Sequence, residues 1–191
     1  MTIFVIRTLD IIFSLTALVV GLPLLVILAL IGYFDTGHPL FKQIRVGRNK
    51  VQFTLVKFRS MNMNTASVAS HLACNSEITT YGKFLRRSKL DELPQLWNVL
   101  VGDMSLIGPR PCLFNQDELI DERTKLSIFK VRPGISGLAQ IRGIDMSTPH
   151  KLAQVDAEMI KEFSLLNYTK LIILTIKGKG SGDAIKPSAE E

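Results

Sequence analysis

Residues 89–100 read KLDELPQLWNVL, and this stretch decides how the rest of the chain is interpreted. Two adjacent carboxylates, Asp91 and Glu92, precede Pro94, and an apolar run follows. Proline suits the first turn of a helix, where backbone N–H groups have no partner inside the helix. The pattern therefore predicts a helix that begins near Pro94, with both carboxylates at its positive end.

Charged residues on both sides of this stretch indicate a site that binds anions. Four basic residues crowd its N-terminal side: Lys83, Arg86, Arg87 and Lys89. On the other side, residues 102–111 read GDMSLIGPRP, and the two prolines hold Arg110 in an extended loop. Taken alone, Asp91 is most simply a helix cap. Carboxylates among fixed cations instead favour chemistry on a phosphate.

The composition indicates a basic protein that works at a membrane. The 191 residues suffice for one domain with a core, 47% of them are hydrophobic, and the formal net charge is +6. Such a chain suits an anionic membrane surface and anionic substrates. It carries no recognisable nucleic-acid-binding motif, so we expect no nucleic-acid partner. Cys74 and Cys112 form no CxxC pair and are interpreted as ordinary thiols in a reducing compartment.

Residues 11–34 form an uncharged apolar run with Pro23 at its midpoint. At about 1.5 Å per residue, a helix of this length can cross a bilayer core of about 30 Å. Proline removes one helix hydrogen bond, so we expect a kink or a break there. A kinked helix that spans the membrane is one alternative. We expect the other, a re-entrant helix-break-helix that enters and leaves the same face.

A β-hairpin is predicted directly after the apolar run. Its strands are Phe41–Val46 and Val51–Phe58, and residues 47–50 form the turn. No acidic residue interrupts its six cations: Lys42, Arg45, Arg48, Lys50, Lys57 and Arg59. These side chains form either a solvated strand face or, as we favour, a face toward lipid headgroups or phosphates. Positive charge beside a membrane helix also places this part in the cytoplasm.

Helices are predicted over much of the remaining chain. Residues 112–130 and 150–163 show amphipathic patterns. Residues 165–176 are apolar over much of their circumference and belong either to the core or to the plane of the membrane interface. Residues 62–79 are expected to be mainly a loop, and residues 177–191 a flexible tail.

Three blocks of the sequence resemble the bacterial monotopic phosphoglycosyl transferases. They are FKQIRVGRNKVQFTLVKFRSM (residues 41–61), YGKFLRRSKLDELPQLWNVLVGDMSLIGPRP (81–111) and VRPGISGLAQIRG (131–143). Those enzymes move a phospho-sugar from a nucleotide-sugar onto a polyprenyl phosphate. The resemblance implies a re-entrant N-terminal helix, although the family's usual Ser-Pro at the break is replaced here by Gly21-Leu22-Pro23.

Together, these features predict an α+β fold that is mostly helical. Residues 1–34 form the membrane-embedded helix-break-helix. Residues 35–191 form a small catalytic domain, in which a β-hairpin and amphipathic interfacial helices surround the site. We expect this domain on the cytoplasmic face of the bacterial inner membrane. The sequence leaves a monomer and a homo-oligomer both open.

The resemblance also implies roles for individual residues. Asp91 would be the nucleophile, and Glu92 would help it hold Mg²⁺ or would orient it. Candidate phosphate-binding residues are Lys57, Arg59, Arg86, Arg110, Gln140 and Arg142, with Arg87 as the alternative to Arg86. In the family, the motif PGITGxAQ, which corresponds to residues 133–140 of this chain, is commonly followed by Asn-Gly-Arg. This chain has Arg142, Gly143 and Ile144 there, so Arg142 is the candidate substitute for the missing arginine.

The implied reaction transfers a sugar 1-phosphate from a UDP-sugar to polyprenyl (undecaprenyl) phosphate and releases UMP through a covalent aspartyl intermediate. It would be the first membrane step of a surface glycan, such as O-antigen, capsule, exopolysaccharide or a glycoprotein glycan. Residues 141–149, which read IRGIDMSTP in place of the Asn-Gly-Arg form, favour an N-acetylated amino sugar as the transferred group. Two rivals are a glycosyltransferase that releases UDP, for which no DxD motif is found, and a membrane-anchored basic adaptor.

Overall fold

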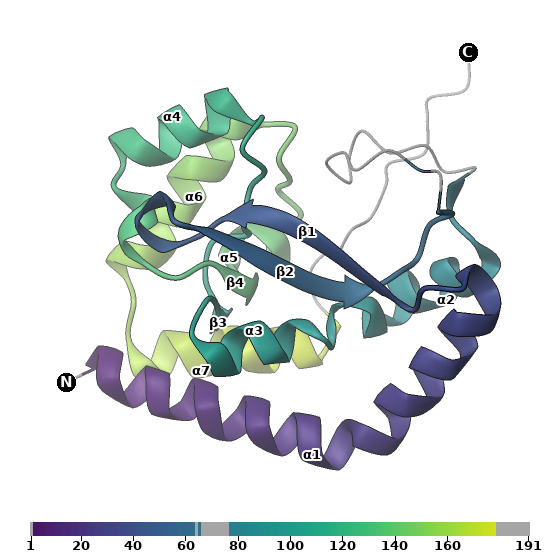
Figure 1. The fold of residues 1–191 in the computed structure, drawn as a ribbon. Coiled ribbons are helices and arrows are strands. Elements are labelled where there is room, and N and C mark those ends of the chain that lie inside the picture. Colours follow the sequence, from purple (N-terminus) through teal and green to yellow (C-terminus); the bar gives the residue numbers. More distant parts are fainter. Residues whose placement is uncertain (1, 64, 66–76, 179–191) are drawn as a thin grey trace.

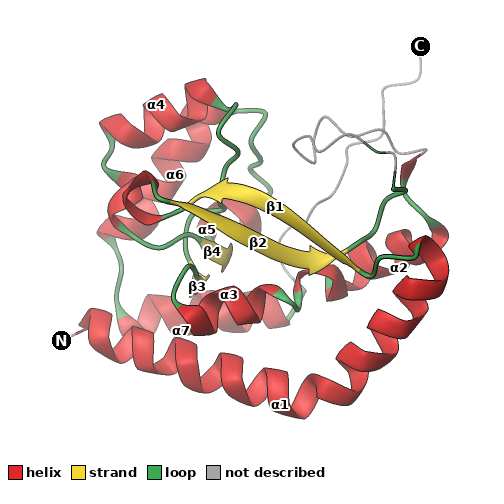
Figure 2. Ribbon diagram, in the orientation of Figure 1, coloured by secondary structure: helices red, strands yellow, loops and turns green. Residues whose placement is uncertain are grey.

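The computed structural model describes residues 2–63, 65 and 77–178, and these are mostly helical (Figures 1 and 2). The predicted tail and much of the predicted loop at residues 62–79 lie outside the described residues, as does Cys74. The elements in chain order are α1 (Thr2–Thr36), β1 (Leu40–Val46), η1 (Arg48–Lys50), β2 (Gln52–Phe58), α2 (Thr80–Ser88), η4 (Leu90–Glu92), α3 (Gln95–Val101), β3 (Ser105–Ile107), α4 (Asp117–Lys125), η5 (Ile128–Lys130), β4 (Gly134–Ser136), α5 (Leu138–Ile141), α6 (Pro149–Lys161) and α7 (Leu165–Ile176).

The predicted β-hairpin is confirmed. Strands β1 and β2 pair antiparallel, with Leu40 opposite Phe58 and Val46 opposite Gln52. Successive side chains of a strand point to opposite faces, so the six cations do not share one face. Arg45 and Lys57 lie on the buried face and are only 6% and 8% exposed. Two of the six cations of the hairpin therefore point into the domain and not into the solvent.

A second sheet was not predicted. Strands β3 and β4 pair parallel, with Ser105 opposite Gly134 and Ile107 opposite Ser136. The backbones approach closely, because a Cβ atom at Gly134 would lie 2.0 Å from the Gly108 nitrogen. Glycine alone fits such an approach. This pairing brings the second and third sequence blocks together.

Helix α1 is one hydrogen-bonded helix that runs through Pro23 without interruption. The expected helix-break-helix is thus a bent helix, and Figure 1 shows its two halves pointing in different directions. A helix can bend at a proline because only one hydrogen bond is lost there. The span Phe4–Thr36 contains an 18-residue stretch with a mean hydropathy of 2.8, and the helix is long and apolar enough to cross a membrane by length and composition.

Both halves of α1 pack against the domain. Ile6 of the first half joins a core cluster with Ile107 and Tyr168. Leu28 of the second half packs with Phe58 and Leu85. The two ends of the apolar helix are therefore held by the same folded unit.

The C-terminal helices agree with their sequence patterns. Helix α6 buries Leu152, Val155 and Met159 on one face, which confirms the amphipathic helix predicted at residues 150–163. Helix α7 contributes Tyr168 to the core, as one of the two interpretations of residues 165–176 predicted, while Leu166 is 78% exposed.

The predicted helical segment at residues 112–130 contains α4 and η5. The segment begins at Cys112, a free thiol that is fully buried. Burial raises the pKa of this thiol, which keeps it protonated and unreactive, as an ordinary structural cysteine.

Candidate active site

Asp91 and Glu92 lie in the short turn η4, which connects α2 to α3. Lys89 ends α2 in the left-handed conformation (φ 59°), and this turns the chain into η4. Helix α3 begins after Pro94, and its N-cap makes no side-chain capping bond. Asp91 is only 2% exposed. Burying a carboxylate is costly, so a buried carboxylate that is not the cap of α3 favours the site interpretation.

The loop arginine predicted to bind phosphate meets the second carboxylate. Both terminal nitrogens of Arg110 donate to one oxygen of Glu92, at 3.2 and 3.3 Å. The two side chains are 22% and 11% exposed, so solvent reaches the pair only in part. The pair fixes the Arg110 guanidinium beside the turn that carries Asp91.

The backbone of Arg110 is also held by a hydrogen bond. Its carbonyl oxygen accepts a hydrogen bond of 2.7 Å from Nη1 of the buried Arg123. The Nε and Nη2 atoms of Arg123 bind one oxygen of Asp156 at 3.0 and 2.6 Å. Arg123 lies on α4 and Asp156 on α6, so the packing of these two helices positions the active-site loop.

A small cavity of about 10 Å³ lies beside Arg110. Lys57 also lines it, so the structure brings together two of the predicted phosphate-binding residues. Arg45 and Gln95 line it as well, and neither was predicted. Arg45 could have been predicted from the sequence, because strand alternation places it on the same face of the hairpin as Lys57 and the buried Leu55.

Arg45 is held toward this cavity by hydrogen bonds. Its Nη1 donates to the carbonyl oxygen of Pro111 at 3.0 Å, and Nε and Nη2 donate to the side-chain oxygen of Gln43 at 3.0 and 2.5 Å. The guanidinium is therefore oriented by the neighbour of Arg110. Together, Arg45, Lys57 and Arg110 can bind several oxygens of a phosphate group.

The orientation of α2 distinguishes Arg86 from Arg87. Arg86 is partly buried, and its Nε donates to the hydroxyl of Ser60 at 2.8 Å, whereas Arg87 is exposed. Arg59 lies over the Phe41 ring, 5.4 Å from its centroid, and its Nε donates to the carbonyl oxygen of His38 at 3.2 Å.

The two candidates of the third block have different surroundings. Gln140 is buried and donates to the carbonyl oxygen of Ile135, a residue that lines the small cavity. Within the described residues, its side-chain oxygen has no hydrogen-bond partner. Arg142 instead forms an exposed bidentate ion pair with Glu158 of α6, at 2.6 and 2.7 Å. Ile144, at the position of the arginine in the family's Asn-Gly-Arg, packs against the core.

The residues of η4 could supply some of the ligands of a magnesium ion, if the substrate and water supplied the others. No group of three or more His, Cys, Asp and Glu side chains that could hold a metal occurs in residues 2–63, 65 and 77–178. Asp91 and Glu92 supply two carboxylates. Magnesium is usually held by one or two carboxylates, with substrate phosphates and water as the remaining ligands.

Comparison with known proteins places this arrangement in a family. The family model described as bacterial sugar transferase matches residues 1–180. The chain is 37% identical to the exopolysaccharide production protein PSS of Rhizobium leguminosarum, over 91% of this chain and 96% of that protein. It is 36% identical to the UDP-glucose:undecaprenyl-phosphate glucose-1-phosphate transferase of Caulobacter vibrioides, over 89% of this chain and 67% of that protein.

A third relative is considerably longer. The undecaprenyl-phosphate galactose phosphotransferase of Salmonella typhimurium is 34% identical over 90% of this chain but only 39% of its own length. The chain likewise spans 35–40% of the length of three further curated relatives that it matches. The matched region nevertheless includes the hairpin, the turn η4 and the paired loops of β3 and β4. The chain therefore belongs to the bacterial sugar transferase family.

Proposed function

We propose that this protein transfers a sugar 1-phosphate from a UDP-sugar to polyprenyl phosphate and releases UMP. The observation that carries the proposal is the buried carboxylate of Asp91, adjacent to the Glu92–Arg110 ion pair. Two relatives whose names describe sugar-phosphate transfer to undecaprenyl phosphate support it. Such a reaction needs a nucleophile near cations that bind phosphate. The turn η4 supplies the carboxylate, and Arg110 and Lys57 supply the cations.

The first step would form a covalent intermediate. A carboxylate oxygen of Asp91 attacks the β-phosphorus of the UDP-sugar, and the bond from that phosphorus to the bridging oxygen breaks. UMP leaves with the electron pair, and Asp91 carries the phospho-sugar as an acyl phosphate. Because both substrates are anions, a covalent intermediate lets one depart before the other reacts.

The second step would regenerate the carboxylate. A phosphate oxygen of the polyprenyl phosphate attacks the phosphorus, and the Asp91–phosphorus bond breaks. Throughout, Lys57 and Arg110 stabilise the negative charge that develops on the phosphate oxygens. Asp91 and Glu92 would hold Mg²⁺, which supplies further charge neutralisation at the phosphates.

The lipid acceptor would reach the site from the membrane. Apolar side chains cover the outside of α1, and others are exposed on the adjacent helices, such as Trp97 on α3 and Ile176 on α7. Because both halves of α1 pack against the same domain, a re-entrant arrangement keeps the N-terminus and the domain on one side of the membrane. The basic hairpin supports the cytoplasmic face of the inner membrane as that side.

The product would be the first lipid-linked intermediate of a surface glycan. We favour an N-acetylated amino sugar as the transferred group, because residues 141–144 depart from the Asn-Gly-Arg form common in the family.

The test is to identify the nucleotide released from a panel of UDP-sugars in the presence of polyprenyl phosphate and Mg²⁺. We expect UMP, formed in proportion to the lipid-linked phospho-sugar. UDP as the product would instead indicate a glycosyltransferase. A protein that binds acidic vesicles but releases no nucleotide from any UDP-sugar would favour the adaptor.

A further inference from the structure

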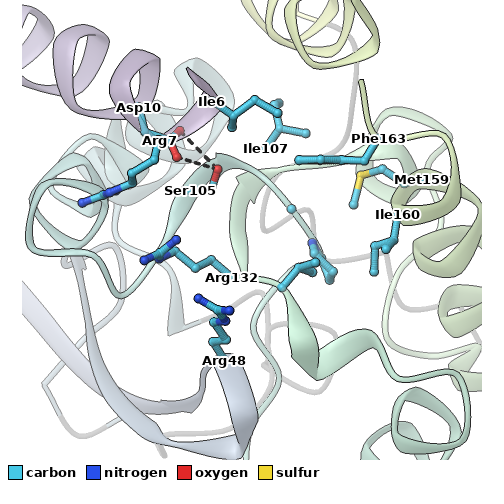
Figure 3. Close-up of a pocket in the computed structure, with 13 residues that line it drawn as sticks. Ile6, Arg7, Asp10, Arg48, Ser105, Ile107, Arg132, Met159, Ile160 and Phe163 are labelled. Atoms are coloured by element: carbon cyan, nitrogen blue, oxygen red, sulfur yellow. Dashed lines mark hydrogen bonds between the residues drawn. The ribbon is translucent and has the colours of Figure 1, made fainter. Parts of the chain in front are cut away.

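A second cavity lies where the start of α1 meets the rest of the domain (Figure 3). Its volume is about 320 Å³, and it shares no lining residue with the small cavity beside Arg110. The first turns of α1, the hairpin turn η1, residues 105–109 and 131–132, and the end of α6 contribute to its wall. The proposed transfer reaction does not use this cavity.

Three arginines line this cavity: Arg7 from α1, Arg48 from η1 and Arg132 from the loop before β4 (Figure 3). Each binds backbone carbonyl oxygens with only some of its five N–H donors. These acceptors belong to Val99 and Leu100 for Arg7, to Gly102 for Arg132 and to Lys130 for Arg48, at 2.7–3.0 Å. Donors therefore remain for a ligand.

In the part of the chain that the structure describes, no acidic side chain forms an ion pair with these arginines. Within the described residues, none of the three has a carboxylate oxygen within 4.0 Å of its nitrogens. The Asp10 carboxylate, which also lines the cavity, accepts hydrogen bonds from the Ser105 hydroxyl, the Leu106 N–H and the Tyr168 hydroxyl. Three guanidiniums and one carboxylate give the wall a formal charge of +2.

The positive charges of Arg7 and Arg48 act on Arg132, and the negative charge of Asp10 opposes them only in part. Burial lowers the pKa of Arg132, and the positive charges of Arg7 and Arg48 lower it further. An anion in the cavity would relieve this repulsion. Arg7 and Arg132 bind carbonyl oxygens at the C-terminal end of α3. Because cations stabilise a helix C-terminus, this role accounts for the positions of these two arginines without a ligand. Arg48 uses its Nε for the carbonyl oxygen of Lys130, the last residue of the three-residue helix η5.

The rest of the wall is apolar. Ile6, Met159 and Phe163 lie across the cavity from Arg48 and Arg132 (Figure 3). Ile6 belongs to α1, whose outer side exposes apolar residues such as Phe4 and Ile12. An apolar chain bound along Ile6 would thus continue toward the surface that we place in the membrane. A ligand for both parts of the wall needs an anionic group and an apolar chain.

We propose that this cavity binds the phosphate group of a membrane phospholipid. The free donors of Arg7, Arg48 and Arg132 bind the phosphate oxygens, which match the planar geometry of guanidinium groups. The first part of the acyl chain lies against Ile6 and Phe163. A free phosphate shares the anionic chemistry but leaves the apolar wall without a partner. The proposal does not depend on phosphoglycosyl transfer.

The test uses the full chain, purified in a neutral detergent and freed of lipid. Its unfolding temperature is recorded during titrations with dihexanoyl-phosphatidylglycerol, dihexanoyl-phosphatidylcholine and inorganic phosphate, because a ligand of the folded state raises this temperature. We expect phosphatidylglycerol to act at the lowest concentration. Equal action of inorganic phosphate would overturn the lipid as ligand and assign the site to a free anion.

Two substitutions connect the binding to this cavity. Arg48 lies in an exposed turn, so Arg48→Gln should fold and should raise the apparent Kd for phosphatidylglycerol about tenfold, the effect of losing one charge-assisted hydrogen bond. Lys151→Gln removes an equal charge from the exposed side of α6 and should leave the Kd unchanged. If both variants bind as the parent does, or if both weaken equally, the cavity is not the site.

Discussion

Arg123 donates a hydrogen bond of 2.7 Å to the carbonyl oxygen of Arg110, although its own side chain is almost completely buried. The same guanidinium forms a buried ion pair with Asp156. One buried cation thus connects the packing of α4 and α6 to the loop whose arginine pairs with Glu92. The stability of the domain and the geometry of the site are coupled through this residue.

Removing Asp156 should therefore destabilise the domain strongly. Asp156→Ala leaves the Arg123 guanidinium buried without its carboxylate, and breaking a buried pair in this way costs about 3–5 kcal/mol. Glu158→Ala is the matched control, because it breaks an exposed pair with Arg142 and should lose at most about 1 kcal/mol. The free energy of unfolding in detergent, measured by denaturant titration, compares the two. Similar losses would show that burial of the Arg123 pair is unimportant.

Asp91→Asn should abolish transfer without unfolding the domain. The amide has nearly the same shape as the carboxylate but cannot act as the nucleophile, so we expect UMP release to fall by several orders of magnitude. Incubation with UDP-sugar alone should give no phospho-sugar adduct by mass spectrometry. Asp117→Asn, an exposed change on α4, should keep both signals. A substantially active Asp91→Asn variant would refute the covalent mechanism.

Arg110→Ala should slow the reaction without preventing folding. The change removes the charge paired with Glu92 and one group that stabilises phosphate oxygens. We expect the rate of UMP release to fall between several-fold and about a thousand-fold, the upper range for losing one such donor. Lys161→Ala, an exposed cation at the end of α6, should retain the parent rate. Equal rates for the two variants would exclude a role for Arg110.

Neighbouring arginines on α2 should respond differently. Arg86 is partly buried and bound to Ser60, whereas Arg87 faces outward. Arg86→Ala should therefore lower the rate of UMP release clearly more than Arg87→Ala. A larger effect at Arg87 would mean that the functional state of α2 is rotated relative to this structure.

The topology of α1 can be tested by cysteine labelling. In a background that lacks Cys74 and Cys112, a single cysteine near Thr2 should be protected from a membrane-impermeant thiol reagent in intact cells and become reactive after lysis. Labelling in intact cells would show that the helix spans the membrane. Pro23→Ala restores a helix hydrogen bond and should increase labelling in intact cells. If its labelling matches the parent's, Pro23 does not set the topology.

Local features could be predicted because they depend on neighbouring residues. The hairpin follows from alternating side chains around Gly47, and α6 follows from apolar residues at helical spacing. Asp91 and Glu92 are consecutive residues, so the sequence alone places them side by side. The apolar run predicted a membrane helix, and its bend agrees with a proline at its midpoint.

Contacts between distant parts of the chain were decided only by tertiary structure. The pairing of Glu92 with Arg110, the parallel strands β3 and β4, and the hydrogen bond from Arg45 to the carbonyl oxygen of Pro111 join residues that no local period relates. Arg142 is a second example. The sequence made it a candidate phosphate-binding residue, but in the structure it forms an exposed ion pair with Glu158 on a neighbouring helix. Periodicity determines which face of an element is apolar. Which charged side chains then meet depends on how the elements pack, because an ion pair forms between whichever groups the packed core brings into contact.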